Sequence, residues 1–86
     1  MLRITADTAV DGIQRVRLDG RLTEADVPEV ARALEPSLRA AARLTLDVSG
    51  LTYLDAEGAN FLRELSAQEV NIRGCSSFVA KLLGLT

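Results

Sequence analysis

The chain has 86 residues, of which 48% are hydrophobic and 26% are charged, a balance that indicates one globular domain and excludes a disordered segment, a collagen repeat or a disulfide scaffold. Ten Lys and Arg residues against 12 Asp and Glu residues give a net charge of -2, and aromatic residues make up 3%, so no positive field or set of stacking rings favours nucleic-acid binding. Histidine is absent and Cys75 is the single cysteine, which removes the commonest ligands of zinc, the commonest general base and any internal disulfide.

Two strands are predicted at the N-terminus. The segment from Leu2 to Ala6 alternates apolar and polar residues, and the segment from Gln14 to Asp19 alternates again. The dipeptide Asp11-Gly12 lies between them, and Asp-Gly favours tight hairpin turns because both positions tolerate positive φ. We therefore expect an antiparallel pair.

An amphipathic helix is predicted next, because apolar residues recur at spacings of three and four from Val27 to Leu38. Its start has two candidates: Asp26 with Glu29, or Thr23 with Asp26. Pro28 fits better in the first turn of a helix that begins after Asp26.

Pro36 is expected to kink or break this helix, because proline lacks the backbone donor and clashes with the preceding turn. Arg43 to Val48 is then rich in strand-forming residues and ends in Ser49-Gly50. Such a run favours a central strand that is covered on both faces.

A second helix is predicted to open at Asp55. Its apolar side consists of Ala59, Leu62 and Leu65, with Phe61 beside them. Its polar stripe, at spacings of three and four, consists of Glu57, Asn60, Glu64 and Gln68.

A short strand is predicted from Val70 to Arg73, followed by a last helix capped by Ser76 and stopped by Gly84. The apolar residues of that helix are Phe78, Val79, Leu82 and Leu83. The order of elements indicates an α/β fold with a mixed sheet of about four strands and about three helices. An N-terminal antiparallel hairpin precedes parallel crossovers. The whole chain, residues 1–86, is expected to be one domain.

A spaced motif marks the junction between the third strand and the second helix. Asp47, Ser49 and Gly50 are followed by Asp55 and Gly58. This pattern resembles the signature of the STAS domain, the family of anti-sigma factor antagonists and of the cytoplasmic domains of sulphate transporters. The resemblance implies a STAS-like fold and a non-catalytic protein that acts by binding another protein.

Two positions of the motif depart from the family pattern. In antagonists that are regulated by phosphorylation, the serine after the loop aspartate is the phosphoacceptor, and that position is Ala56 in this chain. The next position, usually Ser or Thr, is Glu57. Glu57 is interpreted as a complement to the helix dipole, with imitation of a phosphorylated state as the alternative. Binding is thus not expected to be switched at Ala56.

Many family members continue with a further strand and helix after the point where this chain ends. The sequence is therefore interpreted as a short member, as a shortened chain, or as one whose open sheet edge is covered by a partner or by a second copy.

Three other groups of residues have both a structural and a functional interpretation. Asp47 and Asp55 are expected to stabilise the turn and cap the helix, with acid-base chemistry or metal binding as the alternative. Cys75 is expected to be a small buried hydrophobe. The arginines at 15, 17 and 21 are expected to form a solvated basic face, with anion binding as the alternative.

The partner-binding site is expected on the loop from Ser49 to Gly58 and the outward stripe of the following helix. Its residues are predicted to be Asp47, Ser49, Asp55, Ala56, Glu57, Gly58, Asn60 and Glu64. By resemblance, the partner is an anti-sigma factor or a serine kinase, without a cofactor or a catalytic or metal-binding residue. Alternatives are an accessory subunit of a lipid or anion transport system, or a nucleotide or small-ligand sensor. A cytoplasmic location is expected, because the chain lacks a signal-peptide pattern and a long apolar stretch.

Overall fold

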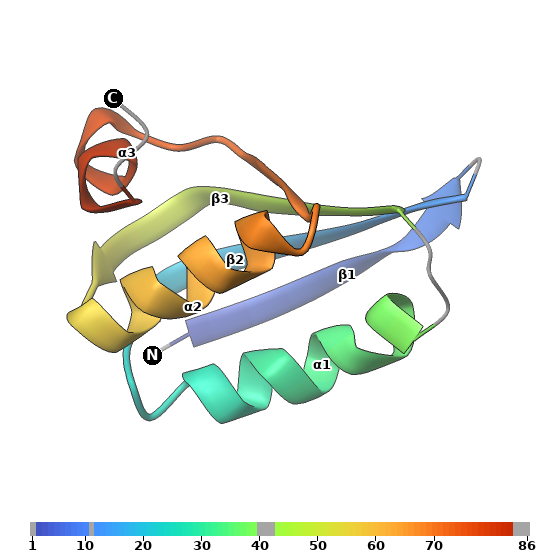
Figure 1. Cartoon of the computed structure of the whole chain (residues 1–86), viewed down its shortest axis with the longest axis horizontal. Coiled ribbons are helices and arrows are strands. Elements are labelled where there is room, and N and C mark those ends of the chain that lie inside the picture. The colour runs from blue at the N-terminus through green and yellow to red at the C-terminus, as the bar shows by residue number, and fades with distance from the viewer. Residues whose placement is uncertain (1, 11, 40–42, 84–86) are drawn as a thin grey trace.

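The computed structural model describes residues 2–10, 12–39 and 43–83. Its elements are β1 (Leu2–Val10), β2 (Ile13–Leu22), α1 (Val27–Arg39), β3 (Arg43–Leu54), α2 (Ala56–Ala67), β4 (Asn71–Arg73) and α3 (Ser77–Leu83) (Figure 1). The sheet has the order β1-β2-β3-β4, in which β1 pairs antiparallel with β2 and the other pairs are parallel. The predicted α/β fold with a mixed sheet is confirmed.

The hairpin between β1 and β2 forms as expected. Val10 pairs with Ile13, and Gly12 has a φ of 76°, the left-handed conformation that glycine adopts without steric cost. Asp11 lies outside the described residues. Both strands are longer than their alternating segments, because β1 continues beyond Ala6 to Val10 and β2 extends from Ile13 to Leu22.

Helix α1 begins directly after Asp26, the start that the position of Pro28 favours, but it ends later than expected. Asp26 precedes the helix, but its carboxylate accepts hydrogen bonds from the backbone N–H and the hydroxyl of Thr23, at 3.1 and 2.9 Å. Pro28 lies in the first turn, as expected. The expected break at Pro36 is wrong, since the helix continues to Arg39. Pro36 lies in the last turn and removes one backbone donor, the one that would bond the carbonyl of Arg32, yet the three residues after it still complete the turn.

The core lies between one face of the sheet and the helices α1 and α2 (Figure 1). The predicted apolar side of α2 is confirmed, because Ala59, Leu62 and Leu65 are buried and Phe61 packs against the core. The largest fully buried side chains are Leu18, Leu22, Val30, Leu34, Leu46, Val48, Leu62 and Val79.

The opposite face of the sheet is open, and the expectation that β3 is covered on both faces is wrong. Leu44, Leu46 and Val48 are buried, whereas Thr45 and Asp47 between them are only partly buried. An alternation of this kind is typical of a strand with one solvated face. Within residues 2–10, 12–39 and 43–83, no helix covers this face.

The last helix is capped as predicted, because the Ser76 hydroxyl oxygen accepts a hydrogen bond from the backbone N–H of Val79 at 3.2 Å. Val79 is buried. The predicted stop at Gly84 lies outside the described residues, as do the side chains of the other three apolar residues of α3.

Candidate partner-binding site

The junction between β3 and α2 is much tighter than expected. The segment from Ser49 to Leu54 is not a loop, since β3 continues to Leu54 and α2 begins at Ala56. The strand continues because Gly50 to Leu54 pair with β2 across register shifts. Asp55 alone connects the two elements, so the residues after it have little freedom to move.

The carboxylate of Asp55 connects the start of α2 with the segment that leads into α1. One carboxylate oxygen accepts a hydrogen bond from the backbone N–H of Gly58 at 2.7 Å, which caps α2. The other oxygen accepts from the backbone N–H of Glu24 at 2.8 Å, in the segment before α1. These bonds, from Gly58 first and then from Glu24, lower the pKa of Asp55 below its usual value. The expected capping role is confirmed.

Gly58 is buried beneath this junction. A Cβ atom at this position would lie 2.6 Å from the backbone oxygen of Leu22 and 3.0 Å from Cδ1 of Leu54. Only glycine lets α2 approach the end of β2 this closely. Gly58 therefore contributes by letting the start of α2 pack closely against the sheet. Because it is buried, it cannot contact a partner itself.

The outer side of α2 presents four of the predicted site residues to solvent. Ala56, Glu57, Asn60 and Glu64 are exposed and follow one another at helical spacing. Nη1 of Arg63 donates a hydrogen bond to Oδ1 of Asn60 at 2.6 Å. Ala56 is the first residue of the helix, and Glu57 lies in its first turn, where a carboxylate interacts favourably with the helix dipole.

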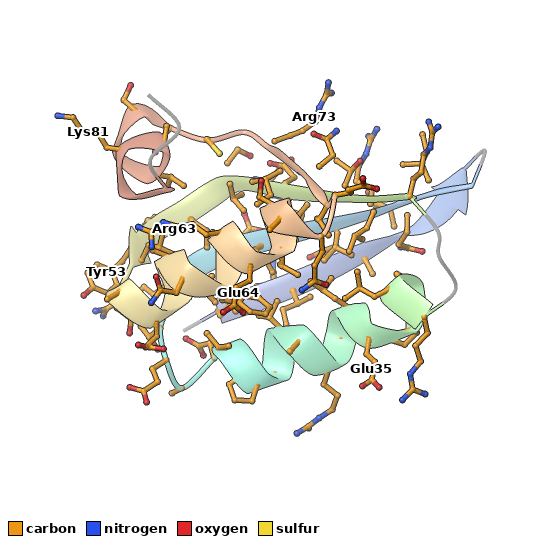
Figure 2. All side chains as sticks on the ribbon, viewed as in Figure 1. Glu35, Tyr53, Arg63, Glu64, Arg73 and Lys81 are labelled. Atoms are coloured by element: carbon orange, nitrogen blue, oxygen red, sulfur yellow. The ribbon has the colours of Figure 1, made fainter. Side chains whose placement is uncertain are left out.

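Sequence reasoning missed Tyr53, which lies beside the start of α2 (Figure 2). Its side chain is 41% exposed, and the guanidinium carbon of Arg21 lies 4.9 Å from the centre of its ring, a cation–π geometry. The apolar residues Leu51 and Leu54 around it are buried. Tyr53 could have been found from the sequence, because an aromatic residue that interrupts the apolar-polar alternation of a strand often lies on the surface.

Asp47 and Ser49 lie apart from α2, on the open face of the sheet. The backbone N–H of Ser49 donates to Oδ1 of Asp47 at 2.9 Å, and this bond lowers the pKa of Asp47. Asp47 and Asp55 are eight positions apart along an extended segment, which at about 3.3 Å per residue corresponds to roughly 26 Å. The two carboxylates therefore cannot act as a catalytic or metal-binding pair, and the alternative interpretation of this pair is wrong.

Cys75 is partly buried and packs against the core. Burial raises the pKa of its thiol, which disfavours the reactive thiolate. Its surroundings agree with the expected role as a small hydrophobe.

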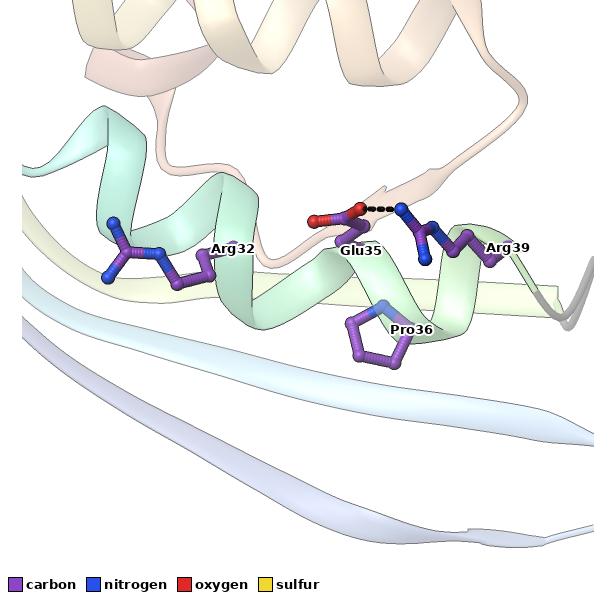
Figure 3. Close-up of a pocket in the computed structure, with 4 residues that line it drawn as sticks. All are labelled: Arg32, Glu35, Pro36 and Arg39. Atoms are coloured by element: carbon purple, nitrogen blue, oxygen red, sulfur yellow. Dashed lines mark ion pairs between the residues drawn. The ribbon is translucent and has the colours of Figure 1, made fainter.

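A second surface feature lies on the outer side of α1. Arg32, Glu35, Pro36 and Arg39 line a hollow there, and Nη2 of Arg39 pairs with Oε1 of Glu35 at 2.6 Å (Figure 3). All four residues come from one helix, so no second element encloses a ligand.

The described part of the chain has neither a cluster of metal ligands nor a membrane-spanning helix. It contains no group of three or more histidine, cysteine, aspartate or glutamate side chains that could hold a metal ion. It also contains no helix that is long and apolar enough to cross a membrane.

A family model described as "Mlab, STAS domain" matches residues 6–86. No curated protein matches the chain. Among solved structures, the STAS domain of an antisigma-factor antagonist from Rhodobacter sphaeroides is similar, with a TM-score of 0.70 and 26% sequence identity over 85% of this chain and 86% of that chain.

Two other solved structures share the fold at lower identity. An anti-sigma factor antagonist from Mycobacterium paratuberculosis gives a TM-score of 0.75 at 18% identity, covering 99% of this chain and 80% of that chain. The anti-sigma factor antagonist SpoIIAA in its unphosphorylated form gives 0.70 at 16% identity, covering 98% and 84%. At these identities the likeness shows the fold alone.

Proposed function

The chain belongs to the STAS domain family, whose model matches residues 6–86, and from this membership we propose that it is a non-catalytic module that binds a protein partner in the cytoplasm. The partner is an anti-sigma factor or a serine kinase, and the chain acts as an antagonist-like regulator. The similarity to the antisigma-factor antagonist of Rhodobacter sphaeroides supports this choice.

The partner binds through what we call the α2 surface, which consists of Ala56, Glu57, Asn60 and Glu64. Exposure of all four residues on one rigid helix is the observation that carries the proposal. The bonds made by Asp55 fix the start of this helix, so little conformational entropy is lost on binding. Tyr53 adds an exposed aromatic side chain at its border, a residue type that is enriched among strong contacts in protein interfaces.

Binding is constitutive at this surface. Ala56 has no hydroxyl group to accept a phosphate, and Glu57 carries a permanent negative charge next to it. A carboxylate has fewer acceptor oxygens and less charge than a phosphate, so Glu57 contributes to recognition without acting as a switch.

The decisive test compares two charge reversals of the same size. Glu57→Lys changes the α2 surface, whereas Glu29→Lys changes an exposed position in the first turn of α1. Tagged wild-type and variant proteins are used to capture partners from a lysate of the source organism, and bound proteins are quantified by mass spectrometry. We expect Glu57→Lys to reduce capture of an anti-sigma factor or kinase about tenfold or more. Equal capture by both variants would exclude the α2 surface.

Restoring the hydroxyl group should restore phosphorylation. We expect Ala56→Ser to accept phosphate at residue 56 from a serine kinase of the anti-sigma factor type with ATP, as measured by mass spectrometry of tryptic peptides. Ala67→Ser, at the exposed C-terminal end of the same helix, is the matched control and should stay unmodified. Failure of Ala56→Ser with several such kinases would argue against the assigned role of position 56.

A second candidate function is that of an accessory subunit of a membrane transport system. The name Mlab in the description of the matching family model favours it, since small STAS proteins also accompany lipid-exporting ATPases. The same capture experiment distinguishes the two: recovery of ATPase or permease subunits that depends on Glu57 would assign the chain to transport.

A further inference from the structure

The open face of the sheet carries an unusual arrangement of charge. Side chains that point to this face alternate along each strand with the buried ones. Its cations are all arginines: Arg3, Arg15, Arg17, Arg21, Arg43 and Arg73. Its anions are Asp7, Asp19 and Asp47. The face is therefore positive in a chain whose net charge is -2.

Cross-strand pairing brings these charges together from distant parts of the chain. Arg15 pairs with Thr45, and Arg17 pairs with Asp47, which in turn pairs with Arg73. Arg17 is occupied, because its Nε lies 3.0 Å from Oδ1 of Asp19. The guanidinium groups of Arg15 and Arg73 make no hydrogen bond or ion pair with any other described residue.

Arg15 and Arg73 stand on two sides of a shallow hollow of about 290 Å³. Thr45, Asp47, Ser49 and Gly74 complete its lining. Arg73 points away from α1 and α2 (Figure 2). Asp47 in the lining attracts Arg15, but neither arginine donates a hydrogen bond to it. A guanidinium group binds a carboxylate with two parallel hydrogen bonds, so both arginines keep their donors for the carboxylate of a partner.

Gly74 gives this hollow its shape. Its φ is 76°, and a Cβ atom there would lie 2.6 Å from Oδ1 of Asp47 and 2.9 Å from the backbone nitrogen of Ser49. Only glycine allows the chain to leave β4 so close to β3. The side of the hollow next to Arg73 is therefore formed by backbone that packs closely against β3.

The three aspartates on this face favour an acidic protein segment over a membrane or a nucleic acid as its partner. A membrane or a nucleic acid presents uniform negative charge, which Asp7, Asp19 and Asp47 would repel at close range. A protein segment can place its own carboxylates opposite the arginines and neutral or basic side chains opposite the aspartates. We infer that the open face of the sheet is a second docking surface, which binds an acidic protein segment and seats one of its carboxylates between Arg15 and Arg73.

This surface is independent of the proposed α2 surface. Helix α2 covers the opposite face of the sheet (Figure 1), so a partner on one surface leaves the other free. A STAS module with both surfaces connects two proteins.

The probe is a synthetic peptide of about ten residues in which Glu and Ser alternate. In an extended strand its carboxylates lie on one side, about 7 Å apart, which matches the spacing of outward side chains on a strand. Binding is measured from amide chemical shifts of the labelled full chain. We expect shifts at outward residues of β2, β3 and β4. Affinity should fall when salt rises from about 50 to 200 mM.

The matched variants are two double substitutions. Arg15→Ser with Arg73→Ser removes the carboxylate seat, and Arg32→Ser with Arg39→Ser removes two exposed arginines of α1. We expect the first to weaken peptide binding about tenfold or more and the second to leave it unchanged. Unchanged shifts in Glu57→Lys would show independence from the α2 surface.

Several outcomes would overturn the inference. The carboxylate site between Arg15 and Arg73 would be excluded if the peptide did not bind or if both double variants lost the same affinity. Chemical shifts confined to α2 would exclude it as well. Phosphatidylserine vesicles that bind more tightly than the peptide through the same arginines would assign the face to a lipid surface. Shifts at this face that depend on protein concentration, before peptide is added, would assign it to a second copy of the chain.

Discussion

Replacing Gly58 by alanine is expected to lower the free energy of unfolding by about 2 kcal/mol. The added Cβ atom would lie 2.6 Å from the backbone oxygen of Leu22. That oxygen cannot move easily, because Leu22 pairs with Leu54 in the sheet and accepts a hydrogen bond from the backbone N–H of Asp55 at 3.3 Å. Helix propensity alone predicts the opposite, since alanine favours a helix by about 1 kcal/mol over glycine.

Urea unfolding followed by circular dichroism measures this change. Gly12→Ala is the control, since nothing lies within 4 Å of its added Cβ atom and only its φ of 76° opposes the substitution. We expect that variant to lose about 1 kcal/mol through backbone strain alone. A gain in stability for Gly58→Ala would contradict the close contact between α2 and β2. If the contact is as described, Gly58→Ala also moves the start of α2 and weakens partner binding.

Stability is expected to fall as the pH decreases below about 4, and Asp55 is one cause. The folded-state pKa values of Asp55 and Asp47 are both lowered by hydrogen bonds from backbone N–H groups. The unfolded chain therefore binds protons more readily than the folded chain. The stability that these carboxylates contribute is complete above their unfolded pKa of about 3.9 and is lost as the pH falls through the folded value.

Asp55→Asn separates this effect from the rest of the acid transition. Asparagine retains one acceptor oxygen for the cap of α2 but does not titrate. We expect the variant to be less stable than the wild type at pH 7 and to lose less of its stability between pH 6 and pH 3. Urea midpoints at these two pH values measure the difference.

Two comparisons make this test specific. Adding Asp47→Asn to Asp55→Asn should flatten the acid transition further. Glu64→Gln removes an exposed carboxylate that accepts no hydrogen bond from a described residue, and it should retain the wild-type pH dependence. A transition of equal steepness in Asp55→Asn and wild type would exclude Asp55 as a cause.

Local features of the fold are predictable from the sequence because neighbours within a few residues decide them. The turn at Gly12, the cap at Asp55 and the cap at Ser76 each depend on a short polar side chain or a glycine next to a periodic segment. The exposed stripe and the buried side of α2 follow from helical periodicity alone. The effect of Pro36 was predicted less well, because the loss of a single backbone donor near the end of a helix need not end the helix.

The candidate site was only partly predictable. Its four exposed residues on α2 come from one local pattern, whereas Asp47 and Ser49 belong to a different surface. The sequence around Ser49-Gly50 favours a turn, yet pairing with β2 keeps β3 extended to Leu54. Tertiary pairing here overrides a local preference.

The sequence by itself determined the order of elements, the mixed sheet, the caps and the family, since these depend on residue type and spacing along the chain. The tertiary structure alone decided which glycines no other residue can replace and which charges meet. Gly58 is constrained by Leu22, and Arg15 and Arg73 line one hollow although 58 positions separate them in sequence. Strand register creates such contacts, and it is fixed by the packing of the whole sheet rather than by any short segment of it.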